Sequence, residues 1–423
     1  MQPRVLLPIL LGGAVGAGGI LQGLHWRNAA SETNSEELRG QITALENEIA
    51  TLQTENQSLR SLAQGGGEVQ VSPELQQFVE TAIGLDFRSS PVVHRIAFEE
   101  LRDRVVASIE SRFPPNSLDH RQQAWRAMGL LAPDDLYAPQ LAATRSLGAR
   151  SWFDDQSGEG WVTDRFEPSS IPDQGALLRV LVRILLHQHY PPRPGYPGDD
   201  ADRSREAIHH GAALTVENRY LARQALGVGF TGTQNRNNDA GDLLASLPVF
   251  IQGLATFPSR SGMPRAEKWL DQSKLLEILH NPPAFSAALY QDSFEAPATP
   301  TLPDSQGNVV LEESAGMLGL RLWLATLDPE NPESLTPADA WRGDLYRLSA
   351  RSDIALDLVW QIQLATPEAA LAISETARAM AGMLAEAEKD PELGQIIVTT
   401  EGRRLLVEMP DATSVRFTHL APE

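Results

Sequence analysis

Apolar and polar positions follow three different patterns along this chain, and each pattern predicts a different kind of segment. Residues 5–24 carry no charge, residues 36–63 place apolar side chains every seven positions, and residues 71–423 mix helical and strand periods. Proline and glycine interrupt the last region at the ends of its periodic segments. We therefore expect a spanning helix, a coiled coil and a globular domain, in this order along the chain.

The uncharged segment 5–24 predicts a transmembrane anchor. At about 1.5 Å per residue it is long enough to cross the roughly 30 Å hydrocarbon core of a bilayer. Arg4 lies in the short segment 1–4 before it, and acidic residues such as Glu36 follow it. This asymmetry predicts a single pass through the inner (cytoplasmic) membrane, with residues 1–4 in the cytoplasm and the body on the extracytoplasmic side. A cleavable signal peptide is the alternative, although no small-x-small cleavage site ends the apolar run.

One face of the predicted spanning helix carries small residues at helical spacing. Its two small-x-x-x-small pairs consist of Gly12, Gly16, Gly19 and Gly23. Such a face lets two helices pack closely in lipid, although glycine is frequent in membrane helices generally. The segment that follows favours close packing, because it predicts a dimer.

The seven-residue repeat in residues 36–63 predicts a parallel two-stranded coiled coil. Its core positions are Leu38, Ile42, Leu45, Ile49, Leu52, Asn56 and Leu59. Isoleucine at position a with leucine at position d favours a parallel homodimer, and one buried asparagine fixes the register. An amphipathic helix lying on the globular domain is the alternative. Residues 64–70 contain three consecutive glycines and are expected to form a flexible linker.

The periodic segments of residues 71–423 predict an α+β domain that is mostly helical. The predicted helices cover residues 73–83, 98–113, 118–131, 174–190, 204–226, 265–279, 311–327 and 365–389. The predicted strands are a hairpin in 151–165 and the segments 345–348, 356–363, 396–400 and 403–408, with a turn at Gly402. Loops are expected at 227–242 and at 191–202, where prolines precede Asp199, Asp200 and Asp202. The segment 174–190 is apolar on nearly every side, which is typical of a helix at the centre of a domain.

Composition excludes several classes of partner and site. The formal net charge is -20, which argues against a nucleic-acid-binding protein and against attachment to an anionic membrane surface. The chain has no cysteine, so disulfides and thiolate metal sites are excluded.

From Ser72 onward, the order of the segments resembles a bacterial family of zincin-like metallopeptidases. Members of that family carry a buried helix with a motif of the type HELTHALQDQHF, then a proline- and aspartate-bearing loop, then a helix with an EGEA-type motif. The segments of this chain that fit the pattern are GLDFRSSPVVHRIAFEELRDRV, SWFDDQSGEGWVTDR, LVRILLHQHY, FIQGLATFPSRSGMP, LLEILHNPPAF, MLGLRLWLA and WRGDLYRLSARSDIALDLVWQ. The resemblance implies a zincin-like fold for residues 71–423.

The residues that carry zincin chemistry are replaced in this chain. Aligning LVRILLHQHY to the family motif puts Arg183 at the first zinc-binding histidine, Ile184 at the catalytic glutamate and His187 at the second histidine. The third ligand position, a glutamate in the family, falls on His210. Zincins need both histidines for the metal and the glutamate to activate water, so the resemblance implies a degenerate member that lacks the HExxH motif. We therefore expect no catalytic residue, no hydrolysis by the family route and no bound metal.

The residues themselves leave several alternatives open. Arg183 lies one helical turn from His187, and its charge could replace that of zinc by holding Glu206, Glu217 or an aspartate of 199–202. His187 and His210 could instead hold zinc as part of a rebuilt hydrolase site. Three functions follow: a pseudo-peptidase that binds a peptide or protein in the former substrate cleft, a metal-dependent hydrolase, or a structural stalk that the globular part merely caps.

Overall fold

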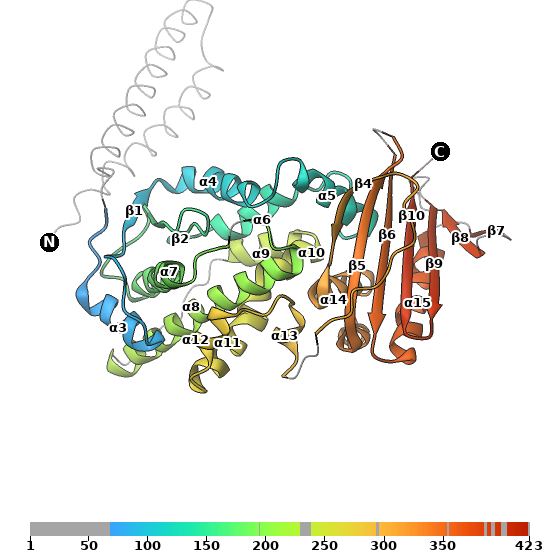
Figure 1. Cartoon of the computed structure of the whole chain (residues 1–423). Helices are drawn as coiled ribbons and strands as arrows, with labels where there is room; N and C mark the ends of the chain where they lie inside the picture. The colour runs from blue at the N-terminus through green and yellow to red at the C-terminus, as the bar shows by residue number, and fades with distance from the viewer. Residues whose placement is uncertain are drawn as a thin grey trace, which may run out of the picture. The chain divides into compact units, whose positions relative to one another are not determined.

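The computed structural model of the chain describes residues 68–193, 195–228, 238–292, 296–352, 355–384, 387–390, 394–398 and 404–421. These residues belong to one compact unit that begins at Glu68. They form a mixed α+β domain with a helical region and a seven-stranded sheet, which confirms the predicted class (Figure 1). The expected anchor (5–24), coiled coil (36–63) and most of the linker (64–70) lie outside the described residues.

The helical region combines short helices with a small sheet. The helices between residues 68 and 228 are α3 (Pro73–Ile83), α4 (Phe98–Ser111), α5 (Ser117–Ala127), α6 (Tyr137–Ser146), α7 (Ile171–His189) and α8 (Asp199–Val228). Strands β2 (Ser151–Phe153) and β3 (Gly160–Thr163) form the predicted hairpin, and β1 (Val93–Ile96) pairs with β3 in parallel. In the hairpin turn, the Asp154 carboxylate accepts hydrogen bonds from the Gln156 N–H and the Ser157 hydroxyl, which fixes the turn.

Helices α7 and α8 pack side by side and run in opposite directions. The N-terminal half of α7 contacts the C-terminal half of α8: the Tyr220 hydroxyl donates to Gln174 Oε1 at 2.6 Å, and Arg179 pairs with Glu217 at 2.8 Å. Helix α7 is buried along nearly its whole length, which confirms the prediction from its apolar pattern. Ser170 caps its first turn by accepting a hydrogen bond from the Asp173 N–H.

The remaining helices complete the domain. They are α9 (Asn238–Ser246), α10 (Val249–Phe257), the π-helical turn η2 (Pro258–Gly262), α11 (Met263–Asp271), α12 (Leu275–His280), α13 (Ala287–Tyr290), α14 (Gly316–Leu327), the 3₁₀ segment η3 (Pro332–Ala340) and α15 (Pro367–Leu384). Helix α8 and η2 approach so closely that a Cβ at Gly211 would overlap the backbone of Gly262. Only glycine allows this backbone contact, which places η2 directly against the middle of α8.

The large sheet is antiparallel throughout, in the order β4-β5-β6-β10-β9-β8-β7. Its strands are β4 (Asn308–Glu313), β5 (Trp341–Ala350), β6 (Leu356–Leu364), β7 (Ala387–Asp390), β8 (Gly394–Val398), β9 (Arg404–Asp411) and β10 (Ser414–Leu420). Helices α14 and α15 pack on it (Figure 1). Trp323 of α14 lies against Trp360 and Phe417, with ring centroids 5.6 Å and 5.0 Å away.

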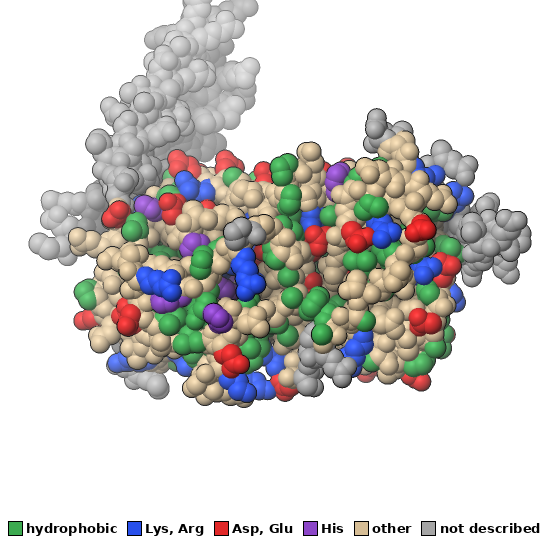
Figure 2. Space-filling model, in the orientation of Figure 1, with side chains coloured by type: hydrophobic (Ala, Val, Ile, Leu, Met, Phe, Trp, Pro, Cys, Tyr) green, Lys and Arg blue, Asp and Glu red, His purple; other side chains and the backbone are tan. Residues whose placement is uncertain are grey.

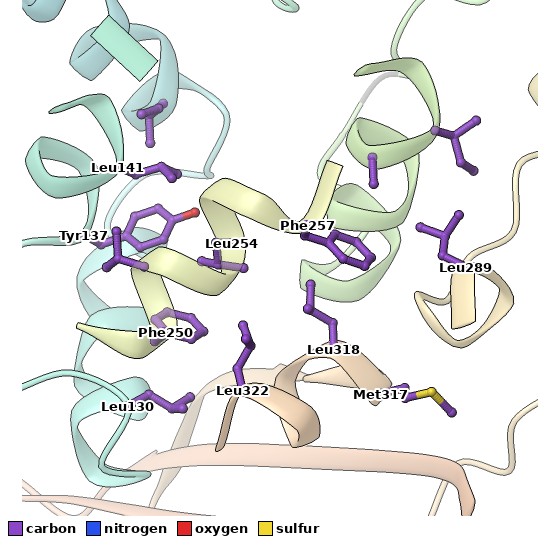
Figure 3. Close-up of a cluster of buried hydrophobic side chains, with 14 of the residues drawn as sticks. Leu130, Tyr137, Leu141, Phe250, Leu254, Phe257, Leu289, Met317, Leu318 and Leu322 are labelled. Carbon is purple, nitrogen blue, oxygen red and sulfur yellow. The ribbon is translucent and has the colours of Figure 1, made fainter. Parts of the chain in front are cut away.

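A continuous hydrophobic core joins the helical region to α14. Figure 3 shows side chains of α6, α10, α13 and α14 pointing toward one another. The labelled members are Leu130, Tyr137, Leu141, Phe250, Leu254, Phe257, Leu289, Met317, Leu318 and Leu322, and all are buried. Because this core crosses between the two regions, we expect the helices and the sheet to unfold together.

Several predicted element boundaries are wrong, and tertiary contacts explain them. Asp199, Asp200 and Asp202 lie in the first turn of α8 rather than in a loop, where acidic side chains complement the helix dipole. The predicted helix 311–327 begins as strand β4, because Leu311 pairs opposite Leu348 of β5. The predicted helix 265–279 is broken between α11 and α12, where Ser273 has a positive φ of 57°.

Other elements were missed or cut short. The predicted helix 365–389 ends at Leu384, and residues 387–390 pair as β7 with β8. The region 227–242, predicted as a loop, contains the start of α9 at Asn238, while Gly402 lies outside the described residues. Strands β1, β4 and β10 and helices α6, α10 and α13 were not predicted. Among the described residues, no helix is both long and apolar enough to cross a membrane.

Candidate functional site

A cleft of about 900 Å³ opens between the end of α4, the end of α7, the first turns of α8 and the segment after α12. Its lining combines histidines, arginines, prolines and aromatic rings. The polar and charged side chains among them are Ser111, Arg112, Gln156, His187, His189, Arg193, Asp202, Arg205, His209 and His280. Figure 2 shows histidine and basic side chains gathered on the part of the surface where α7, α8 and α12 lie. The cleft therefore includes the segment that aligns with the zincin motif.

His187 lies at the cleft end of α7, held beneath the turn of the β2–β3 hairpin. Gly158 of that turn has a φ of 74°, and a Cβ there would overlap the imidazole ring. Phe153 meets the same ring edge-on, with centroids 6.0 Å apart. Burial lowers the pKa of His187; the charge of Asp155 acts to raise it, and the charges of Arg205 and Arg183 act to lower it further. At neutral pH this imidazole is uncharged.

Arg183 holds a carboxylate that the sequence did not suggest. Its guanidinium pairs with Asp155 of the hairpin turn, not with Glu206, Glu217 or an aspartate of 199–202. The Arg183 side chain is buried at 8% exposed, and that of Asp155 is mostly buried at 15% exposed. Burial acts to raise the Asp155 pKa, but the charges of Arg183 and Arg112 outweigh it and hold that pKa well below its usual range. The pair is therefore ionised, although the buried Nε of Arg183 has no hydrogen-bond partner among the described residues.

The next position of the motif, Ile184, is part of the core. Its side chain is 4% exposed, and it packs toward Gly160 of β3 beside Val180. A side chain at this position is directed into the domain and carries no group that accepts a proton.

Helix α8 contributes His209 to the lining of the cleft, whereas His210 is not among the lining residues. Burial lowers the pKa of His209 to about 3, and the charges of Arg205 and Arg183 contribute. Burial likewise lowers the pKa of His210 to about 3, and the charges of Arg183 and Arg179 contribute. His187 and His209, whose pKa values are lowered, thus both line the cleft, together with His189 and His280. Nothing in the sequence distinguishes His209 from its neighbour.

Buried carboxylates of α8 hold the cleft wall together through arginines. Arg112, at the end of α4, donates to both oxygens of Asp202 at 3.0 and 2.9 Å and reaches Glu206 at 3.3 Å. Glu206 also pairs with Arg145 and Arg203. Although burial acts to raise the Glu206 pKa, these arginines keep it well below its usual range. This network fixes α4 and α6 against the start of α8.

No group of three or more histidines, cysteines or carboxylates that could hold a metal occurs among the described residues. His187 and His209 could supply two nitrogen ligands. Asp202 is engaged by Arg112, and Asp155 by Arg183, so neither carboxylate is free to complete a tetrahedral site.

Comparison of the chain with known protein families, with characterised proteins and with solved structures finds no match.

Proposed function

We propose that this chain is a membrane-anchored, extracytoplasmic pseudo-metallopeptidase that binds a peptide or protein segment without cleaving it. In this proposal the fold is zincin-like, and the protein is a parallel homodimer through the coiled coil of 36–63, with the glycine face of 5–24 pairing in the membrane. The observation that carries the binding function is the open cleft of about 900 Å³ at the degenerate motif. A volume of this size lies within the range of natural ligand sites.

The side chains in the cleft support binding rather than hydrolysis. The position aligned with the first zinc ligand is a cation already paired with Asp155, and the position aligned with the catalytic glutamate is Ile184 in the core. A cation repels a divalent metal, and an alkyl side chain cannot activate water. A purely structural stalk is less well supported, because a cap has no need of an open cleft lined by histidines and arginines.

A rebuilt metal site is the second candidate function. It is favoured by one observation, that two neutral imidazoles, His187 and His209, line the same cleft. The pair differs from the expected His187 and His210. A bound ligand or water would have to supply the remaining coordination.

Three measurements on the full chain, purified in mild detergent without a chelator or histidine tag, separate these functions. Elemental mass spectrometry should find no stoichiometric zinc in the protein or in His187→Ala. Random octapeptide pools incubated with the protein should stay uncleaved by mass spectrometry. The same pools, fluorescein-labelled, should show raised anisotropy in its presence. Stoichiometric zinc that is lost in His187→Ala would instead establish the metal-dependent function, and the absence of any peptide binding would refute the proposal.

A further inference from the structure

The charges that line the cleft do not cancel, although the chain as a whole has a net charge of -20. The charged lining residues are the arginines Arg112, Arg193 and Arg205 and one carboxylate, Asp202. Arg112 and Asp202 neutralise each other. The two remaining arginines give the cleft a positive charge in an acidic protein.

Among the described residues, Arg193 and Arg205 are the lining arginines that form no ion pair or hydrogen bond, and they differ in burial: Arg193 is exposed, whereas Arg205 is half-buried. Arg112, Arg183, Arg145 and Arg203 each pair with a carboxylate. The two carboxylates whose charge Arg205 affects are Asp155 and Asp202, which already hold Arg183 and Arg112. A partly desolvated guanidinium without a counter-ion is unfavourable, and an anion that enters the cleft removes this penalty.

The rest of the lining suits a peptide better than a small inorganic anion. The ring-bearing lining residues are Phe113, Tyr190, Pro192, Tyr196, Pro282 and Pro283. Rigid aromatic and proline surfaces bury the side chains of a bound segment at little entropic cost. The neutral imidazoles of His187 and His209 add N–H donors near the unpaired cation.

We infer that the ligand of the cleft is a peptide segment that carries a carboxylate, and that this carboxylate pairs with Arg205. The inference rests on the proposed binding function and names its ligand class. A guanidinium binds a carboxylate through two parallel N–H···O bonds, which a lysine cannot reproduce. The carboxylate belongs either to an acidic side chain or to a free C-terminus.

The test uses three fluorescein-labelled octapeptide pools and fluorescence anisotropy with the full chain in mild detergent. The first pool has glutamate or aspartate at two central positions and an amidated C-terminus. The second has glutamine or asparagine at those positions and is also amidated. The third has the same amides and a free C-terminus. We expect one of the carboxylate pools to bind about tenfold or more tightly than the amidated neutral pool, which is the contribution typical of one charge-assisted pair.

Substitutions of Arg205 test whether this residue is responsible for the preference for carboxylate-bearing peptides. In Arg205→Ala the preferred pool should fall to the affinity of the neutral pool, and Arg205→Lys should recover only part of the loss. Arg219→Ala, which removes a partly exposed arginine of α8 paired with Asp271, is the matched control and should leave binding unchanged. Because Arg205 has no partner among the described residues, Arg205→Ala should also keep the thermal unfolding temperature of the parent chain, so that a loss of binding is not a loss of folding.

The outcomes separate the inference from the proposed function. Equal binding of all three pools, or an acidic preference that survives in Arg205→Ala, overturns the carboxylate inference and leaves a peptide-binding cleft. A failure of every pool to bind overturns both.

Discussion

Around the cleft and at the base of the sheet, buried carboxylates are stabilised by different kinds of partner. Beside the cleft, Asp155, Asp202 and Glu206 each pair with at least one arginine. At the sheet, Asp344 of β5 accepts only from neutral donors: the Ser314 hydroxyl, the Ala315 and Gly316 N–H groups and the indoles of Trp341 and Trp360. Asp200, nearby at the start of α8, accepts from the N–H of Ser286.

The two arrangements respond differently to acid. Arginine partners hold the pKa values of Asp155 and Glu206 well below the usual range, so these groups stay ionised. Burial raises the pKa of Asp344, and it raises that of Asp200 to about 8, because hydrogen bonds from neutral donors only partly offset the loss of water. Asp155 and Glu206 thus keep their charge over a wide pH range, whereas burial raises the pKa of Asp202 despite its Arg112 partner, and the junction of α8 with the sheet is sensitive to pH.

Among the substitutions that test this difference, Asp344→Ala should lower the stability of the domain most. It removes the acceptor of five donors, three of them buried, including the two indole N–H groups at 3.1 and 2.9 Å. Each unsatisfied buried donor costs about 1–3 kcal/mol, so we expect a loss of more than about 4 kcal/mol in the free energy of unfolding, or no folded protein. Urea denaturation of the full chain measures this loss. Asp271→Ala, at a side chain 62% exposed, is the control and should change stability little.

Glu206→Gln should have the next largest effect. It leaves Arg112, Arg145 and Arg203 without their shared anion in a buried setting, which we expect to destabilise the domain by about 3 kcal/mol. The matched change Glu217→Gln removes the partner of Arg179, which is 36% exposed, and should lower stability by less than about 1 kcal/mol. Equal losses in the two variants, measured by urea denaturation, would show that the arginine network contributes no special stability.

Asp200→Asn should remove part of the pH dependence of stability. The folded state keeps a proton on Asp200 up to about pH 8, while the unfolded state loses it near its ordinary pKa of about 3.9. Stability supplied by this group is therefore fully present below pH 4 and falls as pH rises toward 8, by up to about 1.4 kcal/mol per unit.

The comparison with the parent chain isolates this effect, because the histidines titrate in both proteins. His209 and His210, whose pKa values burial lowers to about 3, stabilise the fold above about pH 6.5 and destabilise it on acidification. In thermal unfolding experiments from pH 5 to pH 9, the stability of Asp200→Asn relative to the parent chain should increase as pH rises. A constant difference across that range would contradict a raised Asp200 pKa.

Arg205→Ala should have the smallest effect on stability. Since this guanidinium lacks a protein partner in the described residues, its removal breaks no ion pair and should change the free energy of unfolding by less than about 0.5 kcal/mol. Arg183→Ala, which leaves buried Asp155 unpaired, is the contrasting variant and should be clearly destabilising in the same urea titration.

Helical periodicity predicted the main elements of the described domain well. Segment 73–83 is α3 with the predicted bounds, and the apolar run at 174–190 is the buried helix α7. The hairpin at 151–165 followed from its turn residues. Strand β4 and helix α6 were missed because sheet pairing and burial against distant helices, rather than a local apolar pattern, determine them.

The sequence by itself determined that position 184 carries no proton-accepting group, that 174–190 is a buried helix and that the cysteine-free chain has no thiolate chemistry. These properties depend on residue type or on the 3.6-residue period, which backbone hydrogen bonding fixes locally. Only the tertiary structure decided that Asp155 is the partner of Arg183 and that His209 faces the cleft. Adjacent helical residues point about 100° apart, so the packing of α8 against α7 selects which histidine is presented. The partner of a buried charge is likewise set by elements far apart in the chain, which no local pattern records.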